Sequence, residues 1–273
     1  MVAHTKTLVA ALSKRSDGAT SASPLHNSIV INFAAVVEPT LNWQENSVVL
    51  YDARRLEQVS ENWFQESYWR AAGKVFGEAS GRGSVVFVRH GDDAWVLRHY
   101  QRGGFVGRFI RDRYIWRGVE RTRAFQEWHL LSELSERNLP VPRPIAARVY
   151  RYGFGYTADI ITEYLDNTRP LESILNDGND ILEQWELIGR TLRRFHNHGV
   201  DHTDLNARNI LIDDNRQVFL VDFDKGKVRD SGSWREGNLK RLKRSLRKVA
   251  LETGNAFDSR GWQALVQGYQ SAQ

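Results

Sequence analysis

One stretch, residues 199–225 (GVDHTDLNARNILIDDNRQVFLVDFDK), constrains the fold of this 273-residue chain more than any other. It contains two strand-like runs, Asn209–Asp213 and Gln217–Phe223, which are rich in Ile, Leu, Val and Phe and are separated by a tight turn at Asp214-Asn215. Antiparallel partners lie only about 5 Å apart. The stretch therefore predicts a hairpin whose two outer ends meet.

Oxygen-bearing side chains occupy those two ends. Asp204 and Asn209 precede the first strand and Asp222 lies at the end of the second, with no compensating Lys or Arg in the pattern. Two carboxylates and an amide that converge are unfavourable unless a cation lies among them, and such ligands suit Mg²⁺. We therefore predict a magnesium site, and the alternative is a hairpin with solvated acidic turns.

The spacing of these residues resembles the catalytic loop and metal-binding motif of protein-kinase-like phosphotransferases. The matching residues are His202-x-Asp204-Leu205-x-x-x-Asn209 and Asp222-Phe223-Asp224. The resemblance implies that Asp204 is catalytic and takes the proton of the acceptor hydroxyl, while Asn209 and Asp222 hold Mg²⁺ on the phosphates of ATP. It also implies an α+β, bilobal fold, with an N-terminal antiparallel sheet lobe that carries one helix and a mainly helical C-terminal lobe.

Bulk properties narrow the class of protein. The length suits one or two domains with a full core, and the 41% hydrophobic fraction and nine Trp indicate a packed globular protein. No apolar run approaches the ~18 residues of a membrane span, and no secretion signal is indicated. The absence of cysteine excludes disulfides and thiolate metal sites. A net charge of +5 suggests an anionic partner: nucleic acid, an acidic membrane surface or a phosphorylated substrate.

We expect three regions along the chain. Residues 1–45 have weak periodicity and read as a poorly ordered N-terminal extension, with at most a short strand or helix at Ile29–Val37. Residues 46–165 form the expected N-terminal ATP-binding lobe, and residues 166–273 the C-terminal catalytic lobe. The first lobe should begin with a strand at Val48–Tyr51 and a helix at Glu61–Ala72.

A second hairpin is predicted on either side of the turn at His90–Asp93. Gly81 and Gly83 at its start would let backbone amides approach nucleotide phosphates, and a plain turn is the alternative. Arg98 follows on the next strand, where the kinase-like pattern has a Lys that contacts phosphate. An Arg there can neutralise phosphate with forked geometry, or it can be an exposed strand residue.

A helix is predicted over Thr122–Glu136 from its apolar spacing. Glu127 lies inside it and is the candidate partner of Arg98. Seven arginines precede or begin this helix, and we expect them to face an anionic substrate. They are Arg102, Arg108, Arg111, Arg113, Arg117, Arg121 and Arg123.

Two strands, Ile145–Tyr152 and Tyr156–Tyr164, should lead to a polar hinge at Leu165–Pro170. Adenine is expected to bond to the backbone near Glu163–Leu165. The clearest helix is Ile181–His198, whose apolar stripe ends at a C-terminal glycine, Gly199.

The last predicted helix, Trp234–Val249, is basic and amphipathic. We expect its leucines to pack on the helical lobe whether or not its basic side lies on anionic lipid, and membrane contact is a separate hypothesis.

A narrower resemblance covers the chain from about Val48 onward. Blocks such as LPVPRPIAARVYR, GVDHTDLNARNILID, VFLVDFDKGKVR and WREGNLKRLKRSL resemble the 3-deoxy-D-manno-octulosonic acid (Kdo) kinase family. The resemblance implies a bacterial sugar kinase that transfers the γ-phosphate of ATP to the 4-hydroxyl of Kdo on Kdo-lipid A during lipopolysaccharide core assembly. It implies peripheral contact with the cytoplasmic face of the inner membrane. No role for nucleic acid or for an obligate protein partner is expected.

Two other kinds of kinase and one non-catalytic protein are alternatives to a Kdo kinase. A heptose kinase of the lipopolysaccharide core, or another small-molecule kinase of the same fold, would carry the same motifs. A non-catalytic pseudokinase that binds nucleotide is the third possibility. The resemblance leaves three further motif residues to assign. We expect His202 to brace the loop, and since Asn206 replaces a kinase Lys, we expect Arg98 or Arg82 to supply the cation. Asp224 adds a metal or water contact or merely reflects the family.

Overall fold

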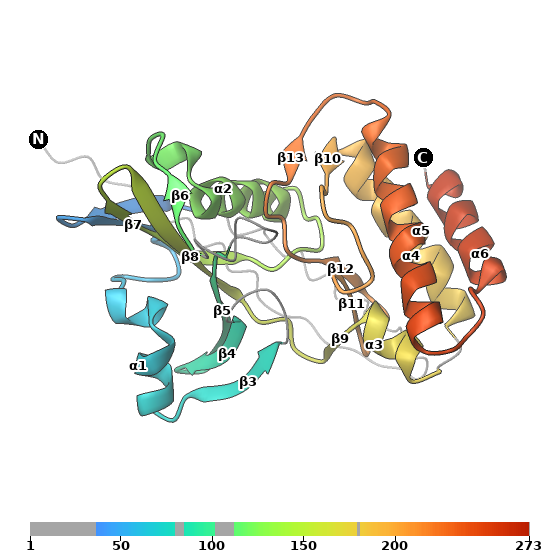
Figure 1. Ribbon diagram of the computed structural model, residues 1–273, viewed down its shortest axis with the longest axis horizontal. Coiled ribbons are helices and arrows are strands. Elements are labelled where there is room, and N and C mark those ends of the chain that lie inside the picture. The colour runs from blue at the N-terminus through green and yellow to red at the C-terminus, as the bar shows by residue number, and fades with distance from the viewer. Residues whose placement is uncertain (1–36, 80–84, 102–111, 179–180, 273) are drawn as a thin grey trace, which may run out of the picture. The chain divides into compact units, whose positions relative to one another are not determined.

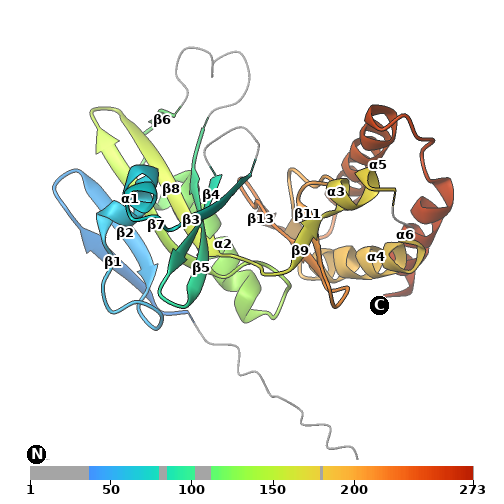
Figure 2. The ribbon, with the colours of Figure 1, turned by 90° about the horizontal axis from the view of Figure 1, so that it is seen from below.

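The computed structural model describes residues 37–79, 85–101, 112–178 and 181–272. Its first half forms an 8-stranded antiparallel sheet with the order β1-β2-β7-β8-β5-β4-β3, and β6 also pairs with β8 (Figure 2). The strands are β1 (Pro39–Trp43), β2 (Ser47–Asp52), β3 (Val75–Ala79), β4 (Val85–His90), β5 (Asp93–His99), β6 (Tyr114–Ile115), β7 (Pro144–Tyr152) and β8 (Gly155–Glu163).

Helices cover both faces of this sheet. On one face, η1 (Glu61–Phe64) and α1 (Glu66–Ala71) bury Trp69 against Trp95 and Leu97 of β5. On the other face lies α2 (Arg123–Glu136), which follows the short helix η3 (Val119–Arg121). Since successive side chains of a strand point to opposite faces, Arg98 lies on the face that carries α2. The sheet therefore holds the candidate phosphate ligand beside the helix that contains Glu127.

The second half is mainly helical (Figure 1). It contains a sheet of order β12-β11-β9 and a pair, β10-β13. Its elements are β9 (Thr168–Pro170), α3 (Leu171–Asn176), α4 (Leu182–Asn197), β10 (Val200–Asp201), β11 (Ile210–Asp213), β12 (Val218–Leu220), β13 (Lys227–Val228), α5 (Trp234–Glu252) and α6 (Ser259–Ser271). An antiparallel sheet lobe followed by a helical lobe confirms the predicted α+β class.

Two glycines set the spacing between α4 and α6. A Cβ at Gly189 would lie 2.0 Å from the Leu265 carbonyl oxygen, and one at Gly268 would lie 2.2 Å from the Glu186 carbonyl oxygen. Any larger residue would push the helices apart. This close contact stabilises α4, which ends at Asn197. Gly199 follows its C-cap with a φ of +75° and leads directly into β10.

The structure corrects the predicted start of the sheet lobe. The proposed disordered extension reached residue 45, but β1 begins at Pro39 and pairs with β2. Its residues alternate between apolar and polar, but the apolar side chains, Leu41 and Trp43, are exposed, so backbone hydrogen bonds to β2 rather than burial order this strand. Residues 1–36 lie outside the described residues.

Other differences are local. The helix predicted over Glu61–Ala72 is two short helices, because Gln65 is extended with φ −110° and ψ 115°. The packing alternative for the basic helix is confirmed, since α5 buries Leu242, Leu246 and Val249 in the core. None of the helices in the described ranges is long and apolar enough to cross a membrane.

Candidate active site

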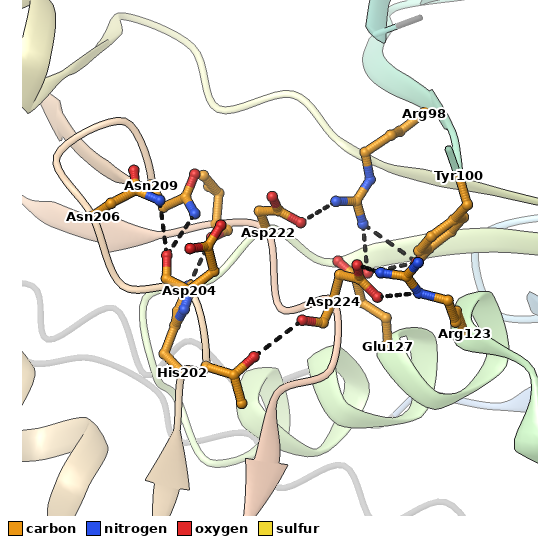
Figure 3. Close-up of polar contacts among 12 residues, drawn as sticks. Arg98, Tyr100, Arg123, Glu127, His202, Asp204, Asn206, Asn209, Asp222 and Asp224 are labelled. Carbon is orange, nitrogen blue, oxygen red and sulfur yellow. Dashed lines mark hydrogen bonds and ion pairs between the residues drawn. The ribbon is translucent and has the colours of Figure 1, made fainter. Parts of the chain in front are cut away.

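The predicted hairpin is formed by β11 and β12, with Ile210 opposite Leu220. Its turn includes Arg216 in the left-handed region, at φ +65°, so the turn is one residue longer than predicted. Beyond the last paired residues, the Val221 N–H donates to the Asn209 carbonyl at 3.1 Å. This bond joins the two ends of the hairpin and brings Asp222 beside the loop that contains Asp204 (Figure 3).

The loop that carries Asp204 is held by its own amides. The side-chain Nδ2 groups of Asn206 and Asn209 both donate to the Asp204 carbonyl oxygen at 2.9 Å. Leu205 and Ala207 are buried and attach the loop to the core. Along the described chain no hydrogen bond or ion pair engages the Asp204 carboxylate, which is exposed. A rigid loop thus presents a free carboxylate to solvent, as a base for an incoming hydroxyl requires.

His202 braces this loop. Its Nε2 lies 2.9 Å from the Val221 carbonyl oxygen, and because a carbonyl only accepts, Nε2 must donate. Its ring is buried and lies against Phe223 at 4.6 Å between centroids. Burial lowers the pKa of His202, despite the opposing hydrogen bond to Val221. A neutral, buried imidazole fits the predicted structural role.

Arg98 reaches the site from β5 and binds two carboxylates. Its guanidinium donates to Glu127 of α2 at 2.5 Å and is also hydrogen-bonded to Asp222. The Tyr100 hydroxyl donates to the same Glu127 oxygen at 2.5 Å. Arg98 and Glu127 therefore form the predicted ion pair, and Arg98 also binds Asp222.

The Asp222 carboxylate is poised to remain ionised. Burial by itself would raise its pKa, but the charge and hydrogen bond of Arg98 outweigh burial and hold the pKa below its ordinary value. Its backbone is in the left-handed region, with a φ of +63°, which is uncommon for a residue other than glycine.

Asp224 has a separate cation. Arg123, the first residue of α2, donates its Nε to Asp224 Oδ1 at 2.6 Å and pairs through a second nitrogen with Oδ2. The Arg123 guanidinium also donates to the Tyr114 hydroxyl at 2.7 Å. Asp224 is thus held by protein, and Arg123, one of the seven arginines expected to face substrate, faces Asp224 instead.

Asn209 and Asp222 offer oxygens that could hold a magnesium ion. Because Asn209 Nδ2 donates to the Asp204 carbonyl, its Oδ1 is the atom left to face a cation. Mg²⁺ commonly takes one or two protein oxygens and completes its shell with phosphates and water. The described ranges hold no group of three His, Cys, Asp or Glu side chains arranged for a metal.

The chain matches one known protein family over most of its length. The lipopolysaccharide kinase (Kdo/WaaP) family matches residues 66–269. The chain belongs to this family. The predicted kinase-like fold is thereby confirmed, and every predicted site residue lies within the matched region.

Three relatives illustrate the similarity. A 3-deoxy-D-manno-octulosonic acid kinase from Vibrio cholerae serotype O1 is 44% identical over 206 residues, which cover 76% of this chain and 88% of the relative. The protein of that name from Stenotrophomonas maltophilia is 45% identical over 75% of this chain and 82% of its own length. That from Xylella fastidiosa is 41% identical over 87% of this chain and 95% of its own length.

The remaining predicted residues of this family member lie as follows. Gly81, Gly83 and Arg82 lie outside the described residues. Glu163 ends β8, and its N–H donates to the Arg143 carbonyl at 2.9 Å. The Leu165 carbonyl accepts from the Thr168 hydroxyl at 2.8 Å, so the backbone of the predicted hinge is held on both sides of Tyr164.

Two contacts of the site were not predicted from the sequence: the hydrogen bond of Tyr100 to Glu127 and the ion pair of Arg123 with Asp224. Tyr100 is two residues after Arg98 and so lies on the same side of the strand, where it reaches Glu127. Arg123 precedes Glu127 by four residues and shares its face of α2. Both positions were therefore available from strand and helix periodicity.

Proposed function

We propose that this protein transfers the γ-phosphate of ATP to the 4-hydroxyl of Kdo on Kdo-lipid A. The observation that carries the proposal is the meeting of Asp204, Asn209 and Asp222 at one end of a hairpin, opposite the Arg98–Glu127 pair (Figure 3). The names of the relatives support Kdo as the sugar that is phosphorylated.

Asp204 is the proposed base. Its exposed carboxylate accepts the hydrogen bond of the acceptor hydroxyl and orients the attacking oxygen toward the γ-phosphate. Phosphoryl transfer has a loose transition state, so the proton moves to the carboxylate late and the main contribution is positioning. The two amides on the Asp204 carbonyl preserve that position.

Asn209 and Asp222 are the proposed magnesium ligands, and the bound ion would neutralise charge on the phosphate oxygens. Arg98 would bind phosphate with its forked guanidinium while Glu127 holds it in place. The backbone at Gly81 and Gly83 would approach the phosphates, and the backbone near Glu163 would bind adenine.

We further propose peripheral contact with the anionic cytoplasmic face of the inner membrane, where a lipid acceptor resides. The solvent side of α5 supports this placement: Lys240 and Arg244 are exposed, and Leu251, about three and two turns further along respectively, is 80% exposed. Cations that flank an exposed apolar side chain favour an anionic lipid surface.

The decisive experiment uses purified protein, ATP and Mg²⁺ with either Kdo-lipid A or a heptosylated core acceptor, followed by mass spectrometry of the lipid products. We expect one added phosphate on Kdo, and tandem fragmentation should place it on that sugar. Phosphate on heptose alone would establish a heptose kinase instead. Nucleotide binding without any phosphorylated product would indicate a pseudokinase.

A further inference from the structure

Charged side chains contact both aspartates of the segment Asp222-Phe223-Asp224. Arg98 of β5 binds Asp222, Arg123 of α2 binds Asp224, and between the two arginines lie Tyr100 and Glu127 (Figure 3). Each end of the three-residue segment is therefore held by a different cation of the sheet lobe.

The two arginines differ in how firmly they are held. Arg98 divides its guanidinium between Glu127 and Asp222. Arg123 binds both carboxylate oxygens of Asp224, and its remaining nitrogen donates to the Tyr114 hydroxyl. Its guanidinium also lies 4.9 Å from the centre of the Tyr114 ring and 5.6 Å from that of Tyr100. A bidentate, half-buried pair of this kind is among the stronger polar contacts in proteins.

This difference matters when nucleotide binds. If Asp222 holds Mg²⁺ and Arg98 binds phosphate, as the proposed function requires, the direct contact of Arg98 with Asp222 is exchanged for contacts with the ligand. Arg123–Asp224 is then the ion pair that still joins the sheet lobe to this segment among the described residues. Both carboxylate oxygens of Asp224 are already paired with Arg123.

We infer that the Arg123–Asp224 pair is a positioning clamp, which holds Asp222 in its metal-binding orientation while Arg98 exchanges Asp222 for nucleotide phosphate. Asp224 is accordingly a positioning residue that acts through Asp222. This inference rests on the proposed nucleotide and magnesium site. Thr203 supports the same position, since its hydroxyl donates to the Asp224 carbonyl at 3.4 Å.

The test compares Asp224→Asn, Arg123→Gln and the double variant. Affinity for Mg²⁺–ADP is measured by calorimetry, and amide hydrogen exchange is measured over residues 221–226 without ligand. We expect each single variant to weaken Mg²⁺–ADP binding about tenfold, the effect of losing one charge-assisted hydrogen bond. The double variant should be no weaker than either single variant, because both remove the same contact. Exchange over the segment should rise in all three.

Controls separate a clamp from general destabilisation. Arg190→Gln removes an exposed pair with Glu186 at 3.0 Å on α4 and should change neither binding nor exchange. Arg123→Lys retains the charge but not the fork, and should retain the fold while losing part of the affinity.

Two results would overturn the inference. One is a loss of Mg²⁺–ADP affinity in Asp224→Asn but not in Arg123→Gln, which would make Asp224 a metal ligand. The other is wild-type affinity and exchange in both single variants. Failure of the wild-type protein itself to bind Mg²⁺–ADP would instead refute the proposed function, so the two failures are distinguishable.

Discussion

At the scale of single residues, the side chain of Asp204 performs the proposed chemistry but contributes little to the stability of the fold. The Asp204 carbonyl oxygen stabilises the loop instead, since it accepts hydrogen bonds from the side chains of Asn206 and Asn209. The Asp204 carboxylate is exposed and takes part in no hydrogen bond or ion pair among the described residues. These hydrogen bonds to the backbone remain when the side chain is replaced. A substitution at this position can therefore lower activity without lowering stability.

Asp204→Ala should therefore lower the rate of phosphate transfer to Kdo-lipid A about a hundredfold to ten-thousandfold, as the loss of a positioned base does. The unfolding temperature should be unchanged. The measurement is initial rate with radiolabelled ATP, together with calorimetric melting. Asp214→Ala, which removes an exposed carboxylate from the turn of the same hairpin, is the matched control. A wild-type rate in Asp204→Ala would exclude Asp204 as the base.

At the scale of elements, one side of α5 packs against the core and the other side is exposed to solvent. Ser245 Oγ accepts from the Ala207 N–H at 3.1 Å, so one side docks on the loop that carries Asp204. Lys243 lies 5.0 Å over the Trp262 ring and Arg247 lies 5.4 Å over the Phe257 ring, so these two cations also contribute to packing. A test of membrane contact should leave both of them intact.

The double charge reversal Lys240→Glu/Arg244→Glu should weaken binding to vesicles that contain anionic lipid at least about tenfold, because each cation near such a surface contributes about 1 kcal/mol. Cosedimentation with anionic and with neutral vesicles measures this effect. Arg190→Glu/Arg216→Glu changes the net charge equally on exposed residues elsewhere and is expected to have a smaller effect. Equal losses in both variants would attribute binding to net charge rather than to α5.

At the scale of the whole molecule, a buried histidine links stability to pH. His196 of α4 lies within hydrogen-bond distance of the Tyr269 hydroxyl of α6, at 2.7 Å, and is 2% exposed. Burial, and next the charge of Arg235, lower its pKa to about 4. An unfolded histidine has a pKa near 6.5, so between these values the unfolded chain binds the additional proton.

The contribution of His196 to the free energy of unfolding is therefore fully present above about pH 6.5 and is lost as the pH falls toward 4, by up to about 3 kcal/mol. His196→Gln should flatten the dependence of that free energy on pH in this interval, as measured by urea titrations at several pH values. Tyr269→Phe removes the hydrogen bond but leaves the ring buried, so the dependence should persist. An unchanged slope in His196→Gln would assign the dependence to other groups.

Elements with strong local patterns were predictable. The helices α2 and α4 and the strands β7, β8 and β11 agree with the sequence to within one or two residues, because apolar periodicity and glycine or proline boundaries are local properties. The strand β1 was missed because it lies at a sheet edge and buries no side chain, so only its pairing with β2 orders it. The break at Gln65 likewise has no marker in sequence.

The sequence by itself determined that Asp204, Asn209 and Asp222 would meet, because a hairpin closes over a short, local stretch of chain. Only the tertiary structure decided which cations would face them. Arg98 and Asp222 are 124 residues apart, and Arg123 and Asp224 are 101 apart. Such pairs depend on how α2 packs on the sheet and how the sheet meets the hairpin, which are long-range contacts that no local pattern encodes.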